Sequence, residues 1–285
     1  MVFHRDNFEG LCYAAADTIQ NDLMDDTALN WSLKDDIREY WSKRSETFDL
    51  SPGHEIFNDE EREGWHALFR RHLGEGAGRP VLDLASGTGV ISHLLHDLGF
   101  HVTGLDFSDA MLARARAKAD RRQAKIRFIA GDAEQTLEAD AAYDAVVTRH
   151  LVWTLVNPPE AFAEWFRVLK PGGTVLIVDA DTGAPRTLKA RALRSVARLL
   201  ARITPASPRP GMDMETHNRI LKQVYFSDGA RAERIVELLQ ARGFQDVIVD
   251  RDLSAIHRGQ WRNMPLRQQL ERASQDRYAI RARKP

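Results

Sequence analysis

The chain has 285 residues, a length that suits one large or two small domains. Its formal net charge is −1 at pH 7, which excludes an overall positive electrostatic potential that would attract nucleic acid. Its single cysteine excludes an internal disulfide and favours a reducing compartment. No apolar run approaches the roughly 20 residues of a spanning helix, and the first residues lack a signal-peptide core, so we expect a cytoplasmic protein without a membrane span.

The amino-terminal part of the chain predicts helices. Residues 1–36 are rich in Asp and Asn, which indicates short helices or a loose extension. The stretch 35–50 places one set of side chains on a single helical face: Ile37, Tyr40, Trp41, Arg44 and Phe48. This helix either packs on the domain or also closes over a ligand with Tyr40 and Arg44. A second amphipathic helix is expected over 59–73, with a core face of Trp65, Leu68, Phe69 and Leu73.

The segment 81–90, Val-Leu-Asp-Leu-Ala-Ser-Gly-Thr-Gly-Val, predicts a strand, a tight turn and the start of a helix. Gly87 and Gly89 allow positive φ and leave room for a ligand, and the helix start offers free N–H groups. A P-loop is excluded because Val90 follows Gly89 instead of Lys. The match to a dinucleotide-binding fingerprint is weak because Ser92 stands where that fingerprint requires Gly or Ala.

Polar residues follow each of the next predicted strands, which cover 101–106, 125–130 and 143–148. Asp106 lies 19 residues beyond Gly87, where a carboxylate accepts hydrogen bonds from ribose hydroxyls. Phe107 follows and is placed to pack on an adenine ring, and Ser108 caps a helix through Met111. Ligands of open α/β sheets bind at the carboxyl edge, where these strand ends meet.

The carboxyl-terminal part departs from this pattern. Residues 186–203 predict a basic amphipathic helix, which has either a solvated face or contacts with an anionic acceptor or a membrane surface. The remaining predicted elements are a loop at 204–211, helices at 214–226 and 230–242 (the latter capped by Ser227-Asp228), strands at 174–179, 244–249 and 278–283, and a loop plus one helix within 251–275.

Four segments carry a resemblance to a known family. Asp-x-Ala-x-Gly-x-Gly at 83–89 resembles motif I of the class I S-adenosylmethionine-dependent methyltransferases, although many members have Gly and Cys where this chain has Ala85 and Ser86. Tyr40-Trp41 with Phe48-Asp49 is similar to the segment that caps the cofactor, and Leu169-Lys-Pro-Gly-Gly-Thr174 precedes the fifth strand. Arg149-His150-x-x-Trp153-Thr154 looks like a bacterial small-molecule subgroup, the ubiquinone/menaquinone-methyltransferase-like group.

The resemblance covers residues 35–180 and implies an α/β fold, a Rossmann-like seven-stranded sheet with strand order 3-2-1-4-5-7-6. It implies a helical amino-terminal cap (1–75), a cofactor-binding core (76–182), a helical lid insertion (183–228) and a carboxyl-terminal part of the sheet (229–285). The cofactor would be S-adenosyl-L-methionine. The expected cofactor-binding residues are Tyr40, Arg44, Asp83, Ala85, Gly87, Gly89, Asp106, Phe107, Met111, Asp132, Ala133 and Arg149.

The favoured hypothesis is methyl transfer to a small acceptor by in-line displacement, with His150 as candidate base because it leaves the fourth strand beside the expected methyl position. His93 and His96 lack a third ligand, so no metal site is expected. The lid would select the acceptor, and its arginines would favour an anionic one. We expect a monomer or homodimer without DNA as partner.

Three alternatives remain open. One is an NAD-dependent oxidoreductase, which shares the glycine turn and the ribose acid. Another is an RNA methyltransferase that uses the basic segment 186–209, although no Asn-Pro-Pro-Tyr/Phe sequence follows the fourth strand. The last is a binding module without catalysis.

Overall fold

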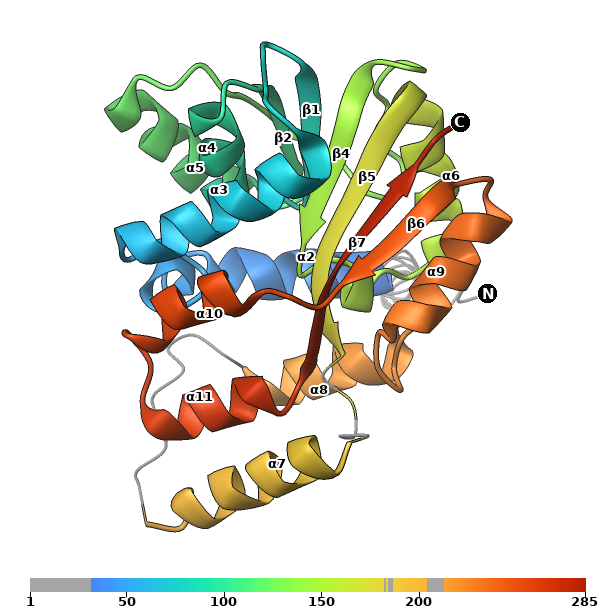
Figure 1. Cartoon of the computed structure of the whole chain (residues 1–285). Coiled ribbons are helices and arrows are strands. Elements are labelled where there is room, and N and C mark those ends of the chain that lie inside the picture. Colours follow the sequence, from blue (N-terminus) through green and yellow to red (C-terminus); the bar gives the residue numbers. More distant parts are fainter. Residues whose placement is uncertain (1–31, 182, 184–186, 204–212) are drawn as a thin grey trace, which may run out of the picture.

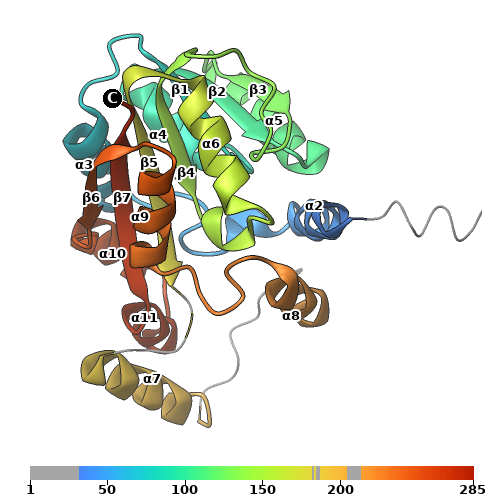
Figure 2. The ribbon, with the colours of Figure 1, turned by 90° about the vertical axis from the view of Figure 1, so that its right-hand side faces the viewer.

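The computed structural model describes residues 32–181, 183, 187–203 and 213–285, and Figures 1 and 2 show it from two sides. A seven-stranded sheet forms its centre, and the strand order β3-β2-β1-β4-β5-β7-β6 confirms the predicted topology. β1 to β5 run parallel, and β7 is antiparallel to both β5 and β6. The strands are β1 (Pro80–Leu84), β2 (His101–Asp106), β3 (Arg127–Ala130), β4 (Tyr143–Arg149), β5 (Leu169–Asp181), β6 (Gln245–Asp250) and β7 (Asp276–Arg283).

Helices cover both faces of the sheet, and side chains of β1 enter both cores. Val81 packs with α3 (Asp59–Leu73) and α4 (Val90–Asp97), whereas Leu82 and Leu84 belong to the core with α6 (Pro158–Val168) and α9 (Ala232–Ala241). Because successive side chains of a strand point to opposite faces, a strand buried on both needs a continuous apolar run. Figure 2 shows α3 and α6 on opposite sides of the sheet.

Two predicted helices are confirmed with their caps. α3 has the predicted bounds, and Asn58 caps it by accepting a hydrogen bond from the backbone N–H of Glu61. All four residues of its predicted core face are buried: Trp65, Leu68, Phe69 and Leu73. α5 (Asp109–Arg122) begins after Ser108, whose hydroxyl accepts from the N–H of Met111 as predicted.

Further helices lie beyond the carboxyl ends of the parallel strands, as Figure 1 shows for α2 (Leu33–Arg44), α8 (Met214–Gln223) and α7 (Leu188–Leu200). α2 and α8 share an apolar cluster of Ile37, Tyr40, Ile220 and Val224. Arg219 of α8 also pairs with Asp36 of α2 at 3.3 Å.

No helix in the described part of the chain combines the length and apolar composition needed to cross a bilayer. The expectations for residues 1–31 and 204–211 lie outside the described residues.

Several predicted boundaries are wrong. α2 ends at Arg44, and Phe48 begins a separate 3-10 turn (Phe48–Leu50). α9 begins at Ala232 without a side-chain cap. Its N-cap residue is Arg231, three residues beyond Asp228, and the carboxylate of Asp228 pairs with Arg231 and Arg234. The single helix expected within 251–275 is two helices, α10 (Ser254–Trp261) and α11 (Leu266–Ala273).

The β5 strand begins five residues earlier than predicted, at Leu169 instead of Thr174. Its pairing with β4 jumps from Tyr143–Leu169 to Ala145–Thr174. The predicted turn of Lys-Pro-Gly-Gly is therefore a bulge in a longer strand, and Gly172 takes φ of 78° there.

Candidate active site

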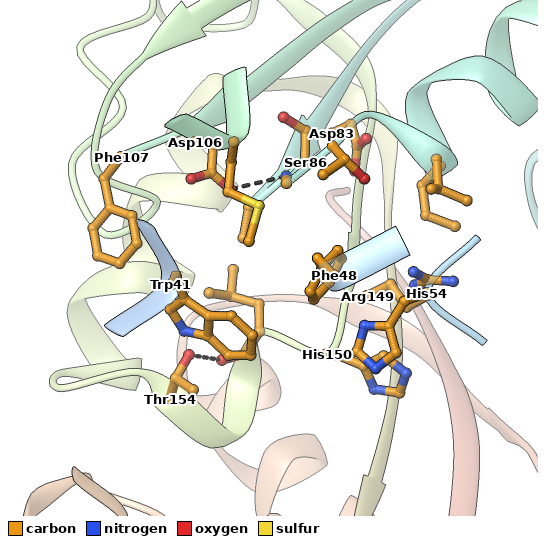
Figure 3. A pocket seen from close by; sticks show the side chains of 17 residues that line it. Trp41, Phe48, His54, Asp83, Ser86, Asp106, Phe107, Arg149, His150 and Thr154 are labelled. Atoms are coloured by element: carbon orange, nitrogen blue, oxygen red, sulfur yellow. Dashed lines mark hydrogen bonds between the residues drawn. The ribbon is translucent and has the colours of Figure 1, made fainter. Parts of the chain in front are cut away.

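Two adjoining pockets lie at the carboxyl edge of β1, β2 and β4, and their empty space, including the part open to solvent, is about 730 and 400 Å³. Their linings share Ala85, Asp106, Phe107, Leu151 and Thr154, so we treat them as two compartments of one cleft. Figure 3 shows the first compartment, with Asp106 and Phe107 on one side and His54, Arg149 and His150 on the other.

The glycine turn after β1 forms one wall of the cleft. Ala85 and Gly87, two of the residues expected to bind the cofactor, have φ of 53° and 55° and line the first compartment. Gly89 has φ of 83° and is not part of either lining. A Cβ atom there would come 3.0 Å from the ring of Phe128 and 3.2 Å from Ala115, so Gly89 permits close packing of the turn on β3 and α5.

The strained position of Ala85 gives a stability prediction. A non-glycine residue in the left-handed region costs roughly 1–2 kcal/mol, and glycine loses part of this gain through the entropy of the unfolded chain. Ala85→Gly should therefore raise the free energy of unfolding by about 0.5–1 kcal/mol in urea titrations. Ala113→Gly, at an exposed site inside α5, should lower it by about 1 kcal/mol. Equal destabilisation by both would contradict the assigned strain.

Asp106 joins the turn to the end of β2. Its Oδ2 accepts from the N–H of Gly87 at 2.9 Å, and its Oδ1 accepts from the N–H of Ser108 at 2.8 Å. The residue is only 5% exposed, and burial raises its pKa to about 6 although the backbone N–H groups act in the opposite direction. Each oxygen keeps a further lone pair, so the carboxylate can accept additional hydrogen bonds from a ligand.

The predicted residues Asp132 and Ala133 line the second compartment, together with a lysine that sequence reasoning missed. Lys34 of α2 donates to Asp132 Oδ2 at 2.6 Å and pairs with Glu134 Oε2 at 2.7 Å. Burial lowers the pKa of Lys34, but the two carboxylates outweigh it and raise that pKa. Lys34 thus ties α2 to the loop after β3 at the rim of the cleft.

Aromatic side chains from α2 and the following turn close the first compartment. Trp41 and Phe48 line it, with ring centroids 5.9 Å apart. Two residues predicted to bind the cofactor, Tyr40 and Arg44, are buried behind this layer and line neither compartment. The Arg44 guanidinium lies 5.2 Å from the centroid of the Trp41 ring, within the range of a cation–π contact.

The end of β4 supplies two predicted residues. Arg149, the last residue of β4, lines the first compartment with its guanidinium 5.5 Å from the centroid of Trp65. Burial lowers the pKa of Arg149 although Glu61 and Asp83 oppose this effect. Among the described residues, no carboxylate forms an ion pair with Arg149.

Asp83 of β1 also lies in the lining. It accepts a hydrogen bond from the hydroxyl of Ser92 at 2.5 Å, and burial raises the pKa of Asp83 to about 7.

His150 follows β4 with φ of 60°, an uncommon value for a residue with a side chain. Its N–H donates to the carbonyl of Val178 at 3.1 Å, and its Nδ1 lies 3.7 Å from Oδ1 of Asp179. Burial lowers the pKa of His150 well below its ordinary value, and the charges of Arg277, Arg149 and Arg272 add to this effect. The lowered pKa favours the neutral imidazole and at the same time makes it a weak base.

A second histidine, His54, lines the same wall and was missed from the sequence. Its ring centroid is 6.3 Å from that of His150 and 4.3 Å from that of Phe48. Burial lowers its pKa well below the ordinary value, as it does for His150. Its place after a Ser-Pro-Gly turn carries no sequence signal for a site. The described residues contain no group of three or more potential metal ligands.

The comparisons with known proteins agree with this arrangement. A family model for a methyltransferase domain matches residues 82–177. A demethylmenaquinone methyltransferase of Renibacterium salmoninarum is 37% identical over 135 residues, covering 46% of this chain and 55% of that protein. A malonyl-[acyl-carrier protein] O-methyltransferase of Serratia marcescens is 36% identical over 121 residues, covering 41% of this chain and 46% of that protein. The chain spans about half the length of these relatives.

Among solved structures, phosphoethanolamine N-methyltransferase 2 of Haemonchus contortus in complex with S-adenosyl-L-methionine has a TM-score of 0.61 at 17% identity. The match covers 86% of this chain and 57% of that chain. A likeness at this level of identity establishes the fold alone. Residues 82–177 match the model of a methyltransferase domain, and the chain has the seven-stranded Rossmann-like fold of the solved methyltransferase structure.

Proposed function

We propose that the chain is an S-adenosylmethionine-dependent methyltransferase that transfers a methyl group to a small-molecule acceptor by in-line displacement. The observation that carries the proposal is the junction of the glycine turn with Asp106, where the Gly87 N–H donates to the buried carboxylate. Asp106 lines both compartments and retains lone pairs for two neighbouring hydroxyls, which suits the ribose of an adenosine.

The two compartments fit the two ends of such a cofactor. The second is lined by Phe107 and Leu105 together with Asp132, which suits a flat base with an amino group. The first contains Asp83 and Arg149, whose opposite charges suit the ammonium and carboxylate of an amino acid. Of the predicted cofactor-binding residues, Ala85, Gly87, Met111 and Ala133 complete the lining, and Tyr40, Arg44 and Gly89 act from outside it.

When bound, S-adenosylmethionine supplies a methyl group on a sulfonium, which passes to a nucleophile as the sulfur takes the electron pair. Because alignment provides much of the rate of such a displacement, the protein mainly positions the reactants and excludes water. Trp41 and Phe48 close the first compartment for this purpose. Trp41 would also attract a cationic centre by about 0.5–2 kcal/mol. His150 would remove a proton where the nucleophile arrives protonated.

The relatives support a small-molecule acceptor without naming it. By their names, one acts on demethylmenaquinone and the other on a malonyl group of a carrier protein. Since both share only about half their length with this chain, the features that select the acceptor can differ. An anionic acceptor is part of the proposal because of the arginines of the lid segment, since Arg149 is assigned here to the cofactor's carboxylate. No relative reported above is named as an oxidoreductase or an RNA enzyme.

The proposed division of the chain has a cap (1–75), a core (76–182), a lid (183–228) and a carboxyl-terminal part of the sheet (229–285). Packing of α8 on α2 supports a lid role for α8, and the ring of His217 of α8 lies 5.7 Å from those of Tyr40 in α2 and Trp153 after β4. No described residue of 183–228 lines either compartment. A cytoplasmic location and a monomeric or dimeric state complete the proposal.

Transfer of a radiolabelled methyl group tests this function. The protein would be incubated with S-adenosylmethionine labelled on its methyl group and a bacterial extract, which is then separated into small-molecule, protein and RNA fractions. We expect a labelled small-molecule product distinct from S-adenosylmethionine, and much less of it with an Asp106→Ala control at the same subsaturating cofactor concentration. Label confined to RNA would favour the alternative methyltransferase and contradict a small acceptor.

A further inference from the structure

Helix α7 exposes its apolar side chains to solvent. Leu188, Ala192, Val196 and Leu199 of α7 and Ile203 in the turn after it follow a spacing of four, four, three and four residues, which places the four helical residues on one face. Leu188, Leu199 and Ile203 are 81%, 60% and 77% exposed. The side that packs on the protein contains Ala197, which is buried, and Arg194, which donates to the carbonyl of Gly183 at 3.0 Å.

This orientation is the reverse of the usual one. A helix on the surface of a globular protein normally turns its apolar face to the core and its charged face to water. The exposed apolar face of α7 and the adjoining Ile203, which together we call the outer stripe (Leu188, Ala192, Val196, Leu199 and Ile203), have no partner among the described residues that buries them. The stripe therefore fits a surface outside the described chain.

Charge indicates which surface this is. All charged side chains of residues 187–203 are basic: Lys189, Arg191, Arg194, Arg198 and Arg202. At 100° per residue, Arg191, Arg198 and Arg202 flank the outer stripe on one side and Lys189 on the other. An apolar stripe bordered by Lys and Arg is the pattern of a helix that lies in the headgroup region of an anionic membrane.

We propose that α7 is a docking helix for an anionic membrane surface, with the outer stripe inserted between headgroups and the flanking basic residues on phosphates. A second copy of the chain fits less well, because a symmetric contact through the stripe would bring two rows of like charges together. Nucleic acid fits less well because its binding relies on phosphate contacts and base stacking. An aliphatic stripe contributes to neither, and residues 187–203 contain no aromatic side chain for stacking.

The position of α7 gives the contact a consequence for the cleft. α7 lies on the same side of the sheet as α2 and α8, beyond the carboxyl ends of the strands where the cleft is formed (Figures 1 and 2). If the proposed function is correct, a docked protein would hold its cleft near the bilayer and favour acceptors that partition into lipid. The docking itself does not depend on that function.

Vesicle sedimentation of the full-length protein tests the docking. The probes are vesicles of phosphatidylcholine alone and of an equimolar mixture with phosphatidylglycerol. We expect at least ~10-fold stronger binding to the mixed vesicles, weakening as salt is added. Leu199→Asp and Ile203→Asp should each weaken that binding by about 10-fold or more, since each places a charge in the stripe.

Leu137→Asp is the matched control, because Leu137 is 83% exposed in the loop between β3 and β4, away from α7. It should bind vesicles like the unaltered protein. Circular dichroism and titration with S-adenosylmethionine would show that the variants fold, and cofactor affinity should not change. Failure of the unaltered protein to sediment, equal binding to neutral vesicles, or full binding by both stripe variants would each overturn the proposal. So would a stripe-dependent dimer or RNA complex without vesicle binding.

Discussion

Asp106→Ala is expected to weaken the binding of S-adenosylmethionine about 10- to 100-fold while the protein still folds. The substitution removes charge-assisted hydrogen bonds worth about 1.5–3 kcal/mol. It also leaves the N–H groups of Gly87 and Ser108 without their acceptor. Asp106→Asn keeps the shape and removes the charge, so it should show most of the loss with less disturbance of the turn. Calorimetric titration measures both affinities.

The pH dependence of binding gives an independent check on Asp106. Burial raises its pKa to about 6, so the free carboxylate is mostly charged at pH 7 and mostly protonated at pH 5. Affinity of the unaltered protein should therefore fall as pH decreases through 6, and this component should be missing in Asp106→Asn. Asp109→Ala, an exposed acid in the first turn of α5, is the control and should bind normally. Unchanged affinity in Asp106→Ala would remove Asp106 from the site.

His150→Asn is expected to lower turnover by roughly 100-fold or more, with cofactor affinity little changed, if His150 is the general base. Asparagine is the informative replacement because it tolerates the positive φ of this position and cannot accept the proton. Because the pKa of His150 lies well below its ordinary value, the base is already neutral at pH 6.5. Its protonation should therefore cause no change in turnover between pH 6.5 and 8.

The controls separate catalysis from loop geometry. His150→Ala also places a Cβ in the left-handed region but offers no polar side chain, so any extra loss relative to His150→Asn reports the loop. His101→Ala, exposed at the amino end of β2, should leave turnover unchanged. Parallel losses of turnover and cofactor affinity in His150→Asn would assign His150 to loop order. Full turnover would exclude it as a base.

The parts of the fold that the sequence predicted are those with local causes. The bounds of α3 follow from the Asn58 cap and a 15-residue amphipathic pattern. The glycine turn and Asp106 were predictable because a parallel strand–helix–strand unit fixes the distance between the first turn and the second strand end. The predicted strand order came from the family resemblance, and the observed sheet confirms it.

The rest depends on contacts between distant residues, which leave no pattern in one sequence. Lys34 meets Asp132 across 98 positions of the chain. Helical spacing put Tyr40, Trp41 and Arg44 on one face, but only packing against α8 decides that Tyr40 is buried and Trp41 lines the cleft. Asp228 was predicted to cap a helix, but in the folded chain its carboxylate pairs with Arg231 and Arg234. The exposed direction of the apolar stripe on α7 likewise depends on packing against α11.

Calorimetric titration of the unaltered protein with S-adenosylmethionine, and separately with NAD, tests the central proposal most directly. The cleft has one carboxylate at the end of β2 and one compartment on either side of it. We therefore expect S-adenosylmethionine to bind at a single site with a dissociation constant on the order of 1–100 μM, and NAD to give no saturable heat at the same concentrations. Saturable binding of NAD without binding of S-adenosylmethionine would contradict the proposed function and favour an oxidoreductase.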